Sequence, residues 1–284
     1  MMKFTVTKKI SAQQQLSLRL RRRGQSIAMV PTMGYLHQGH QSLIRRGLRE
    51  ADVVVTTIFV NPTQFAPTED LNRYPRDPQG DLKKIRRSGG QVVFMPEQNE
   101  IYPDDYETYV TVEDLTRTLE GRLRPTHFKG VTTVVTKLFN IVQPDVALFG
   151  MKDYQQAVVL KKMTRDLNWP IKFIICPTIR EKDGLALSSR NSYLALQARQ
   201  EATALYQALT LAKRMVVGGE NRVAPISQKM RRMIRQIAPS AEIDYIAFTE
   251  CDSLKPTRNI VKGTVASLAV RLGPVRLIDN MRIA

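Results

Sequence analysis

Short, nearly continuous apolar runs alternate with amphipathic stretches over about the first 180 residues of the chain. Residues 52–60 are β-branched and almost uniformly apolar, which is typical of a parallel strand covered on both faces. Repeated strand–helix–strand units with short connections predict an α/β fold, a Rossmann-like doubly wound parallel sheet with right-handed crossovers. The expected strands are 26–31, 52–60, 91–95, 145–149 and 171–176, and the expected helices are 39–50, 78–88, 131–142 and 155–167.

The pattern changes after Pro177. Two amphipathic helices, 195–215 and 226–237, are followed by short strands at 242–248, 264–270 and 276–278. This order is typical of an α+β arrangement. We therefore predict two domains, a Rossmann-like domain over residues 1–178 and a smaller C-terminal α+β domain over residues 179–284. Residues 97–108 are polar and contain proline, so we expect a surface loop there.

The formal net charge is +17 with a pI near 10.1, a balance that invites a nucleic-acid interpretation. Only one dense basic run stands out, residues 19–23, and it falls on an amphipathic helix where a solvated face explains it. No RNP-like motif, zinc-ligand cluster or basic tail accompanies it. We expect no nucleic-acid partner, and interpret part of the charge as attraction for anionic substrates.

No apolar stretch reaches the roughly 18 residues of a membrane span, and the N-terminus lacks the apolar core of a secretory signal. We therefore expect a cytoplasmic protein with no membrane partner. Cys176 and Cys251 are too few for a disulfide framework, and both sit beside apolar runs. We interpret each as a buried, inert thiol.

The most informative motif joins the first strand to the first helix, at residues 31–40 (PTMGYLHQGH). The carboxyl edge of an open α/β sheet is where ligands bind. His37 and His40 stand one helical turn apart, with Gly39 allowing close approach of the backbone. A helix N-terminus favours phosphate and disfavours imidazolium, so two neutral N–H donors facing a phosphate are expected. Alone, so short a pattern also arises by chance, and no companion ligands indicate a metal site.

Two further motifs contain phosphate-binding chemistry. In residues 149–156 (FGMKDYQQ), Lys152 is a mobile point charge, and Asp153 is either a Mg²⁺ ligand or a helix N-cap. In residues 183–191 (DGLALSSRN), two hydroxyls precede Arg190. That run predicts a phosphate clamp, or simply a turn with an N-cap.

Two motifs point to polar substrates. Gln64, in residues 59–65 (FVNPTQF), offers both a donor and an acceptor without charge. Residues 124–130 (RPTHFKG) precede a helix and could hold a carboxylate, or form a solvated loop.

Taken in order, these motifs, together with 73–76 (RYPR) and 276–280 (RLIDN), resemble the pantothenate synthetase family over nearly the whole chain. The family is a branch of the HxGH nucleotidyltransferase superfamily. It has a Ser/Arg loop in place of KMSKS. The resemblance implies a ligase that uses ATP and Mg²⁺ to convert (R)-pantoate into an acyl-adenylate, which β-alanine then attacks to give pantothenate, AMP and pyrophosphate. It also implies a homodimer, an ATP- and pantoate-binding first domain and a lid formed by the second.

The resemblance implies site residues position by position. His40 matches the catalytic histidine, with His37, Lys152 and Arg190 also in the catalytic set, and Asp153 is the expected metal ligand. Matches to ATP contacts are Met33, Gly34, Tyr35, Leu36, His37, Gln38, Gly39, His40, Gly150, Met151, Lys152, Asp153, Ile179, Leu187, Ser188, Ser189 and Arg190. Matches to substrate-binding residues are Gln64, Gln156, Tyr74, Arg124 and His127.

Two positions depart from the family pattern, since Gln38 and Met151 stand where acidic residues are common. Three other functions share some of these features. They are a nucleotidylyltransferase that leaves AMP on its product, a fragment of a tRNA-charging synthetase, and an inactive RNA-binding module. The chain lacks a KMSKS run and an anticodon-binding extension, which counts against the synthetase fragment.

Overall fold

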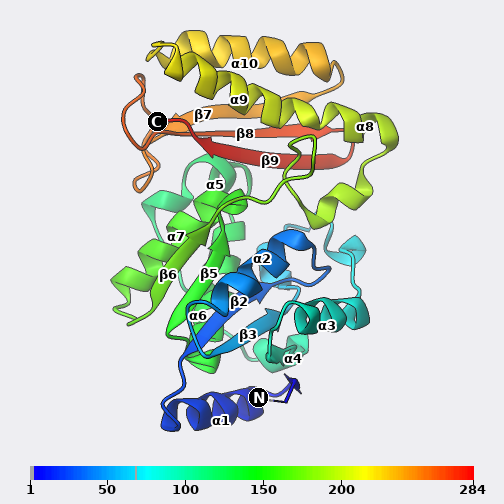
Figure 1. Ribbon diagram of the computed structural model, residues 1–284, viewed down its shortest axis with the longest axis vertical. Coiled ribbons are helices and arrows are strands. Elements are labelled where there is room, and N and C mark those ends of the chain that lie inside the picture. The colour runs from blue at the N-terminus through cyan, green and yellow to red at the C-terminus, as the bar shows by residue number, and fades with distance from the viewer. Residues whose placement is uncertain (1–2, 68) are drawn as a thin grey trace. The chain divides into compact units, whose positions relative to one another are not determined.

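The computed structural model describes residues 3–67 and 69–284, which divide into two compact units. The first contains the described residues up to Gly150 together with Val159–Pro177, and the second contains Met151–Val158 and Thr178–Ala284. The segment that follows the fifth strand thus packs with the C-terminal part of the chain. We describe each unit by itself (Figure 1).

The first unit contains a six-stranded parallel sheet in the order β1-β4-β3-β2-β5-β6. Its strands are β1 (Thr5–Thr7), β2 (Ile27–Thr32), β3 (Val53–Ile58), β4 (Val92–Phe94), β5 (Val146–Gly150) and β6 (Lys172–Cys176). The predicted α/β doubly wound class is confirmed. The strand order reverses between β2 and β5, which pair through Ala28↔Val146 and Met29↔Ala147. Such a reversal creates the crevice where open α/β folds bind ligands.

The helices between these strands are α1 (Ile10–Arg22), α2 (Gln38–Gly47), α3 (Pro78–Arg87), α4 (Gln98–Ile101), α5 (Leu119–Leu123) and α6 (His127–Val142), with short 3₁₀ turns η1 (Pro62–Gln64), η2 (Leu71–Arg73) and η3 (Asp114–Thr116). After β5, the turn η4 (Met151–Asp153) and the start of α7 (Tyr154–Asp166) belong to the second unit, and the rest of α7 belongs to the first. Every residue of β3 is buried, as its β-branched composition predicts. Ile44 of α2 and Leu148 of β5 share one core with Val54, so α2 is anchored directly over the switch point.

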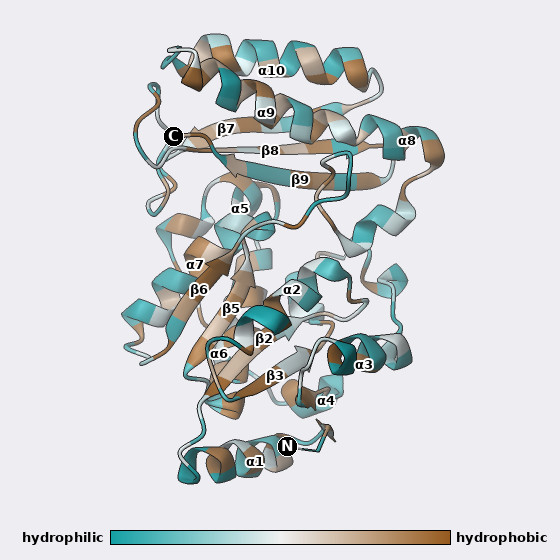
Figure 2. Cartoon of the chain, in the orientation of Figure 1, coloured by the Kyte–Doolittle hydropathy of each residue, from teal (hydrophilic) through white to brown (hydrophobic). Residues whose placement is uncertain are grey.

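The second unit contains an antiparallel sheet of β7 (Glu242–Thr249), β8 (Val265–Leu272) and β9 (Val275–Arg282). It also contains η5 (Ser189–Tyr193), α8 (Leu196–Glu201), α9 (Thr203–Val217) and α10 (Val223–Ile237). Ile226, Met230 and Ile234 recur at helical spacing and are fully buried against the sheet. Figure 2 shows this difference in hydropathy: the strands β5 and β6 are mostly hydrophobic (brown), whereas hydrophilic (teal) and hydrophobic residues alternate along α10.

Several local expectations were wrong. The helix expected over 195–215 breaks at the fully buried Ala202, which ends α8 and begins α9. The helix expected from 131 begins four residues earlier, at His127, so the second half of the motif 124–130 is helical and does not precede the helix. Residues 97–108 contain α4, whose Ile101 is fully buried. Cys251 is only partly buried, unlike Cys176. The three-residue strand β1 was missed.

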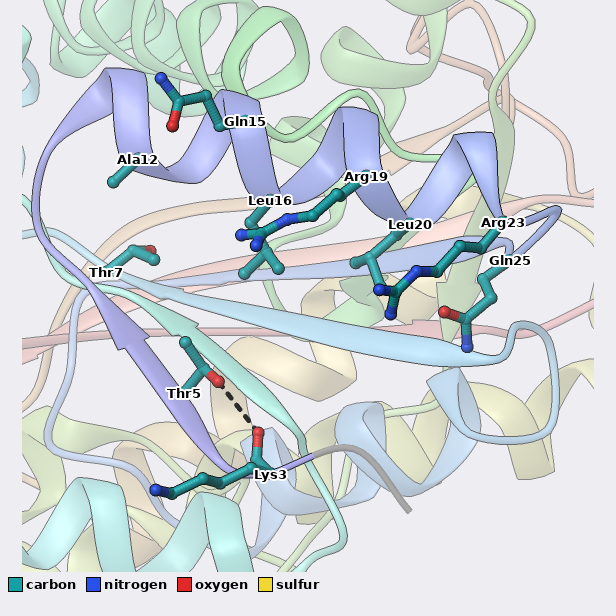
Figure 3. A pocket seen from close by; sticks show the side chains of 10 residues that line it. All are labelled: Lys3, Thr5, Thr7, Ala12, Gln15, Leu16, Arg19, Leu20, Arg23 and Gln25. Carbon is teal, nitrogen blue, oxygen red and sulfur yellow. Dashed lines mark hydrogen bonds between the residues drawn. The ribbon is translucent and has the colours of Figure 1, made fainter.

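The basic run at residues 19–23 ends α1, and its arginines are exposed. Arg19 and Arg23, with Lys3, line a hollow of about 630 Å³ between α1 and β1 (Figure 3). None of the predicted site residues lines it. None of the helices formed by residues 3–67 and 69–284 combines the length and apolarity needed to cross a bilayer.

Candidate active site

The loop after β2 is folded back by Asp81 of α3. Gly34 and Tyr35 both adopt left-handed backbone conformations, with φ values of 84° and 50°. The backbone N–H groups of Tyr35 and Leu36 then donate to the two carboxylate oxygens of Asp81, at 2.8 and 2.7 Å. The whole segment between strand and helix is therefore tied to a helix from another part of the first unit.

Asp81 is only 1% exposed, and burial raises the pKa of its carboxyl, although hydrogen bonds from Leu36 and Tyr35 oppose this rise. Sequence reasoning missed this residue. One signal existed, since Asp81 lies one turn before Ile85 on the buried face of α3. A carboxylate on an apolar helix face needs hydrogen-bond donors, and here they come from the loop.

His37 and His40 cap the first turn of α2 reciprocally. Nδ1 of His37 accepts from the backbone N–H of Gly39 at 3.1 Å, and Nδ1 of His40 accepts from the backbone N–H of His37 at 3.2 Å. The arrangement matches a capping box in which two imidazoles replace the usual hydroxyl and carboxylate. The ring centroids are 4.1 Å apart.

This capping determines which nitrogen holds the proton. A nitrogen that accepts from a backbone N–H uses its lone pair for that bond, so this geometry assigns the ring proton to Nε2. In this tautomer, Nε2–H is the donor that each ring could offer to a ligand.

Gly39 is required by the ring of His37. A Cβ at position 39 would lie 2.9 Å from Nδ1 and from Cε1 of that ring, closer than real Cβ contacts. Glycine therefore permits His37 to fold over the helix start. Gln38, at the same turn, is exposed.

Gln64 lies in η1, just beyond the end of β3, and is 9% exposed. Its Oε1 accepts from Nδ2 of Asn61 at 3.1 Å, and its Nε2 donates to the sulfur of Met33 at 3.1 Å. Met33 of the predicted ATP loop and Gln64, a predicted substrate-binding residue, are therefore in contact. Asn61 also donates to the carbonyl of Gly130, where a Cβ would lie 2.4 Å from the carbonyl oxygen of Thr63. Gly130 thus allows α6 to approach η1 closely.

His127 begins α6 and is buried, with Nδ1 donating to the backbone carbonyl of Gln64 at 2.9 Å. Burial, aided by the charge of Arg124, lowers the pKa of its imidazole to about 4. The ring is neutral at physiological pH.

Arg124 forms a two-point ion pair with Glu69, with Nε to Oε1 at 2.5 Å and Nη2 to Oε2 at 2.7 Å. Burial opposes ionisation of Glu69, but the hydrogen bond and charge of Arg124 outweigh it and hold the pKa of Glu69 below its usual value. This partner was not expected from the sequence. Tyr74, five residues after Glu69, is buried and its ring packs edge-on against the ring of Phe65.

The second unit contains the other predicted residues. After Gly150 ends β5, the turn η4 contains Met151, Lys152 and Asp153, with Nζ of Lys152 donating to Oδ1 of Asp153 at 3.1 Å. Gln156 lies in the first turn of α7, where it is partly exposed.

Residues 179–187 form a narrow hairpin. The N–H of Leu187 donates to the carbonyl of Ile179 at 3.0 Å, and Gly184 turns the chain with φ of 94°. Ser188 then caps η5, its hydroxyl accepting from the N–H of Arg190 at 3.2 Å. Ser189 is buried. The motif therefore does form a turn with an N-cap, the second of the two interpretations offered from the sequence. Ser188 and Arg190 both lie at the start of η5.

No three His, Cys, Asp or Glu side chains gather as metal ligands within residues 3–67 and 69–284. Any divalent ion here would need oxygen ligands from a substrate beside a single carboxylate such as Asp153, which is how proteins commonly hold Mg²⁺.

Comparison with known proteins decides the family. The family model for pantoate–β-alanine ligase matches residues 5–282. The chain belongs to this family. A pantothenate synthetase of Moorella thermoacetica is 53% identical over 261 residues, covering 92% of both chains.

Solved structures agree with this family assignment. The crystal structure of the pantothenate synthetase of Thermus thermophilus matches with a TM-score of 0.94 and 41% identity, covering 99% of both chains. That of the Francisella tularensis pantoate–β-alanine ligase, complexed with β,γ-ATP and β-alanine, matches with a TM-score of 0.80 and 33% identity over 98% of this chain and 97% of that one. The chain is thus a ligase with the fold of its family.

Proposed function

We propose that this ligase condenses (R)-pantoate with β-alanine in two steps, using ATP to form pantoyl-adenylate first. Family membership supports the overall reaction, and the Francisella tularensis relative was solved with an ATP form and β-alanine. The observation that carries the mechanism is the pair His37 and His40, whose Nδ1 atoms are both occupied by backbone N–H groups. Each imidazole therefore serves as an Nε2–H donor.

In the first step, an oxygen of the pantoate carboxylate attacks the α-phosphorus of ATP and pyrophosphate leaves. Negative charge moves onto the leaving group, and fixed N–H donors stabilise it without reorganising. We assign this role to His37 and His40. We assign further phosphate donors to Lys152, Ser188, Ser189 and Arg190. The segments Met33–His40, Gly150–Asp153 and the positions Ile179 and Leu187 make the remaining ATP contacts.

Mg²⁺ fits this donor set as an ion held mainly by the triphosphate. Asp153 is the carboxylate that we assign to it, and substrate phosphates would supply its other oxygen ligands. When bound, the ion neutralises part of the phosphate charge.

In the second step, the free amine of β-alanine attacks the activated carbonyl, the C–O bond to AMP breaks, and pantothenate forms. Gln64 and Gln156 hold pantoate through their amides, and Gln64 also lies next to the amine. We assign Arg124 to the β-alanine carboxylate, because a guanidinium suits a carboxylate; β-alanine would have to share Arg124 with Glu69, which holds its Nε and Nη2 in this structure. Tyr74 and the neutral His127 line this part of the site.

We also propose that the protein is a homodimer. We place it in the cytoplasm, where its substrate ATP is available. Light scattering coupled to size exclusion would give twice the 32.3 kDa chain mass. A monomer at micromolar concentration would contradict the dimer.

Isotope exchange between pyrophosphate and ATP tests the mechanism. Exchange should require pantoate and proceed without β-alanine, whereas free AMP should accumulate only when β-alanine is added. A nucleotidylyltransferase would leave AMP on its product instead. Exchange that needs no pantoate, or that needs β-alanine, would contradict the proposal.

A further inference from the structure

The motif at residues 276–280 near the end of the chain has no role in the reaction described so far. Asp279 and Asn280 are adjacent on β9, and both are buried, at 3% and 4% exposure. Buried polar side chains cost free energy unless they form hydrogen bonds, so their partners are informative.

Asn280 holds the turn that contains Lys152. Its Nδ2 donates to two consecutive backbone carbonyls, that of Met151 at 2.9 Å and that of Lys152 at 2.8 Å. Both amide protons are therefore used on η4, the 3₁₀ turn between β5 and α7. One side chain thus determines the direction of two successive peptide groups.

Asp279 holds the hairpin that leads to Ser188. Its carboxylate accepts both arms of the Arg180 guanidinium, at 2.6 and 2.9 Å, and also the backbone N–H of Asn280 at 2.8 Å. Arg180 in turn donates to the carbonyl of Gly184 at 3.1 Å and lies over the ring of Tyr206, 4.6 Å from its centroid. The hairpin of residues 179–187 is thus braced to β9 by a charged pair.

Asn280 is a poor choice for stability alone. Its Oδ1 is buried, and within residues 3–67 and 69–284 no donor reaches it. An apolar side chain in this strand would bury the same volume without leaving an acceptor unsatisfied. The residue is therefore better explained by the two bonds that its Nδ2 donates than by its contribution to the sheet.

We infer that Asp279 and Asn280 are a positioning pair for the adenylation step, orienting the Lys152 turn and the Ser188–Arg190 segment from one strand of the second unit. The inference rests on the proposed function of those two segments. Neither Asp279 nor Asn280 touches substrate in this account; each acts through another group. Reacting groups must be held to within a fraction of an ångström, so loss of either brace should reduce the rate.

A double-mutant cycle tests whether Asn280 acts through Lys152. Asn280→Ala should lower kcat/KM for ATP in pyrophosphate exchange at least tenfold. In a Lys152→Ala background the same change should cost less than threefold, because the group that it positions is gone. Asn280→Asp, which presents an acceptor to two carbonyls, should lose at least as much activity as Asn280→Ala.

A parallel cycle pairs Asp279→Asn with Arg190→Ala. The loss of kcat/KM in the double variant should again be smaller than the product of the losses in the two single variants. Leu277→Ala is the matched control on the same strand, since Leu277 belongs to the core of the second unit. It should lower Tm and leave KM for ATP unchanged.

Failure of the proposed function and failure of the positioning role would give different results. Pantoate-dependent exchange by the wild type tests the proposed function, and the cycles test the positioning pair. If wild-type exchange occurs but the Asn280 and Lys152 losses multiply in full, the positioning role is wrong. It is also wrong if Asn280→Ala only lowers Tm, as Leu277→Ala should, while its kinetic constants stay at wild-type values.

Discussion

The backbone N–H of His37 donates to Nδ1 of His40, so the first histidine of the motif orients the ring of the second. The ring of His37 is fixed in the same way by the N–H of Gly39. The two side chains that cap α2 are thus the ones to which we assign phosphate binding. This dual use makes it possible to separate their contributions experimentally.

Substitutions of His40 should separate the cap from the donor. His40→Asn keeps an acceptor near the position of Nδ1 but loses the Nε2–H. We expect its Tm to stay within about 3 °C of wild type while pyrophosphate exchange falls about a hundredfold, which corresponds to about 3 kcal/mol of lost transition-state stabilisation. His40→Gln places an amide donor closer to the Nε2 position and should retain more activity. Equal activity of the two variants would contradict the Nε2–H assignment.

Gly39→Ala should harm activity without harming the fold. Alanine favours a helix over glycine by up to about 1 kcal/mol, which offsets the lost cap bond of His37, worth about the same, so Tm should change little. The new methyl group meets the ring of His37, and we expect kcat to fall at least tenfold. The same change in a His37→Ala background serves as the control. There it should cost nothing further, and a second full loss would show that the clash lies elsewhere.

Asp81→Asn should loosen the loop before α2. The amide has one acceptor for two backbone N–H groups, and its NH₂ faces the other N–H. Leaving a buried donor unsatisfied costs about 1–3 kcal/mol, so Tm should fall by several degrees. KM for ATP should rise, because the loop contains predicted ATP contacts. Differential scanning calorimetry and exchange kinetics measure the two effects, and an unchanged KM would limit Asp81 to a structural role.

His127 should make the fold sensitive to mild acid. Its pKa is about 4 in the folded chain and about 6.5 when unfolded, so between these values the unfolded state binds the extra proton. The free energy of unfolding therefore declines as pH drops from about 6.5 towards 4, by up to about 3 kcal/mol from this group. His127→Asn, whose amide can still donate to the Gln64 carbonyl, removes the titration. Urea unfolding at several pH values should show a shallower acid decline for this variant; identical slopes would refute the assignment.

The fold and the linear motifs could be predicted because their signals are local. The β-branched run that became β3 and the histidine pair at the start of α2 each lie within ten residues of sequence. Periodicity and helix-start chemistry are sufficient to identify such features. The neutral state of the two imidazoles is still a prediction from the helix field, and the structure adds capping bonds that turn Nδ1 of each ring towards the backbone.

The supporting contacts could not be predicted because they join distant parts of the chain. Asp81 meets a loop 45 residues earlier, and Asn280 meets a turn 128 residues earlier. Glu69 pairs with Arg124 across 55 positions. A single sequence contains no pairing information over such separations. The one sequence signal was the spacing of Asp81 and Ile85, which puts the carboxyl on the apolar face of α3, where it needs hydrogen-bond partners.

The central claim is that pantoate becomes an acyl-adenylate, and oxygen transfer tests it most directly. With pantoate labelled by ¹⁸O in its carboxylate, attack on the α-phosphorus followed by cleavage of the carbonyl C–O bond leaves one labelled oxygen on AMP. Mass spectrometry of the products should therefore find one ¹⁸O in each AMP and none in pyrophosphate. Unlabelled AMP, or label in inorganic phosphate beside ADP, would contradict the account.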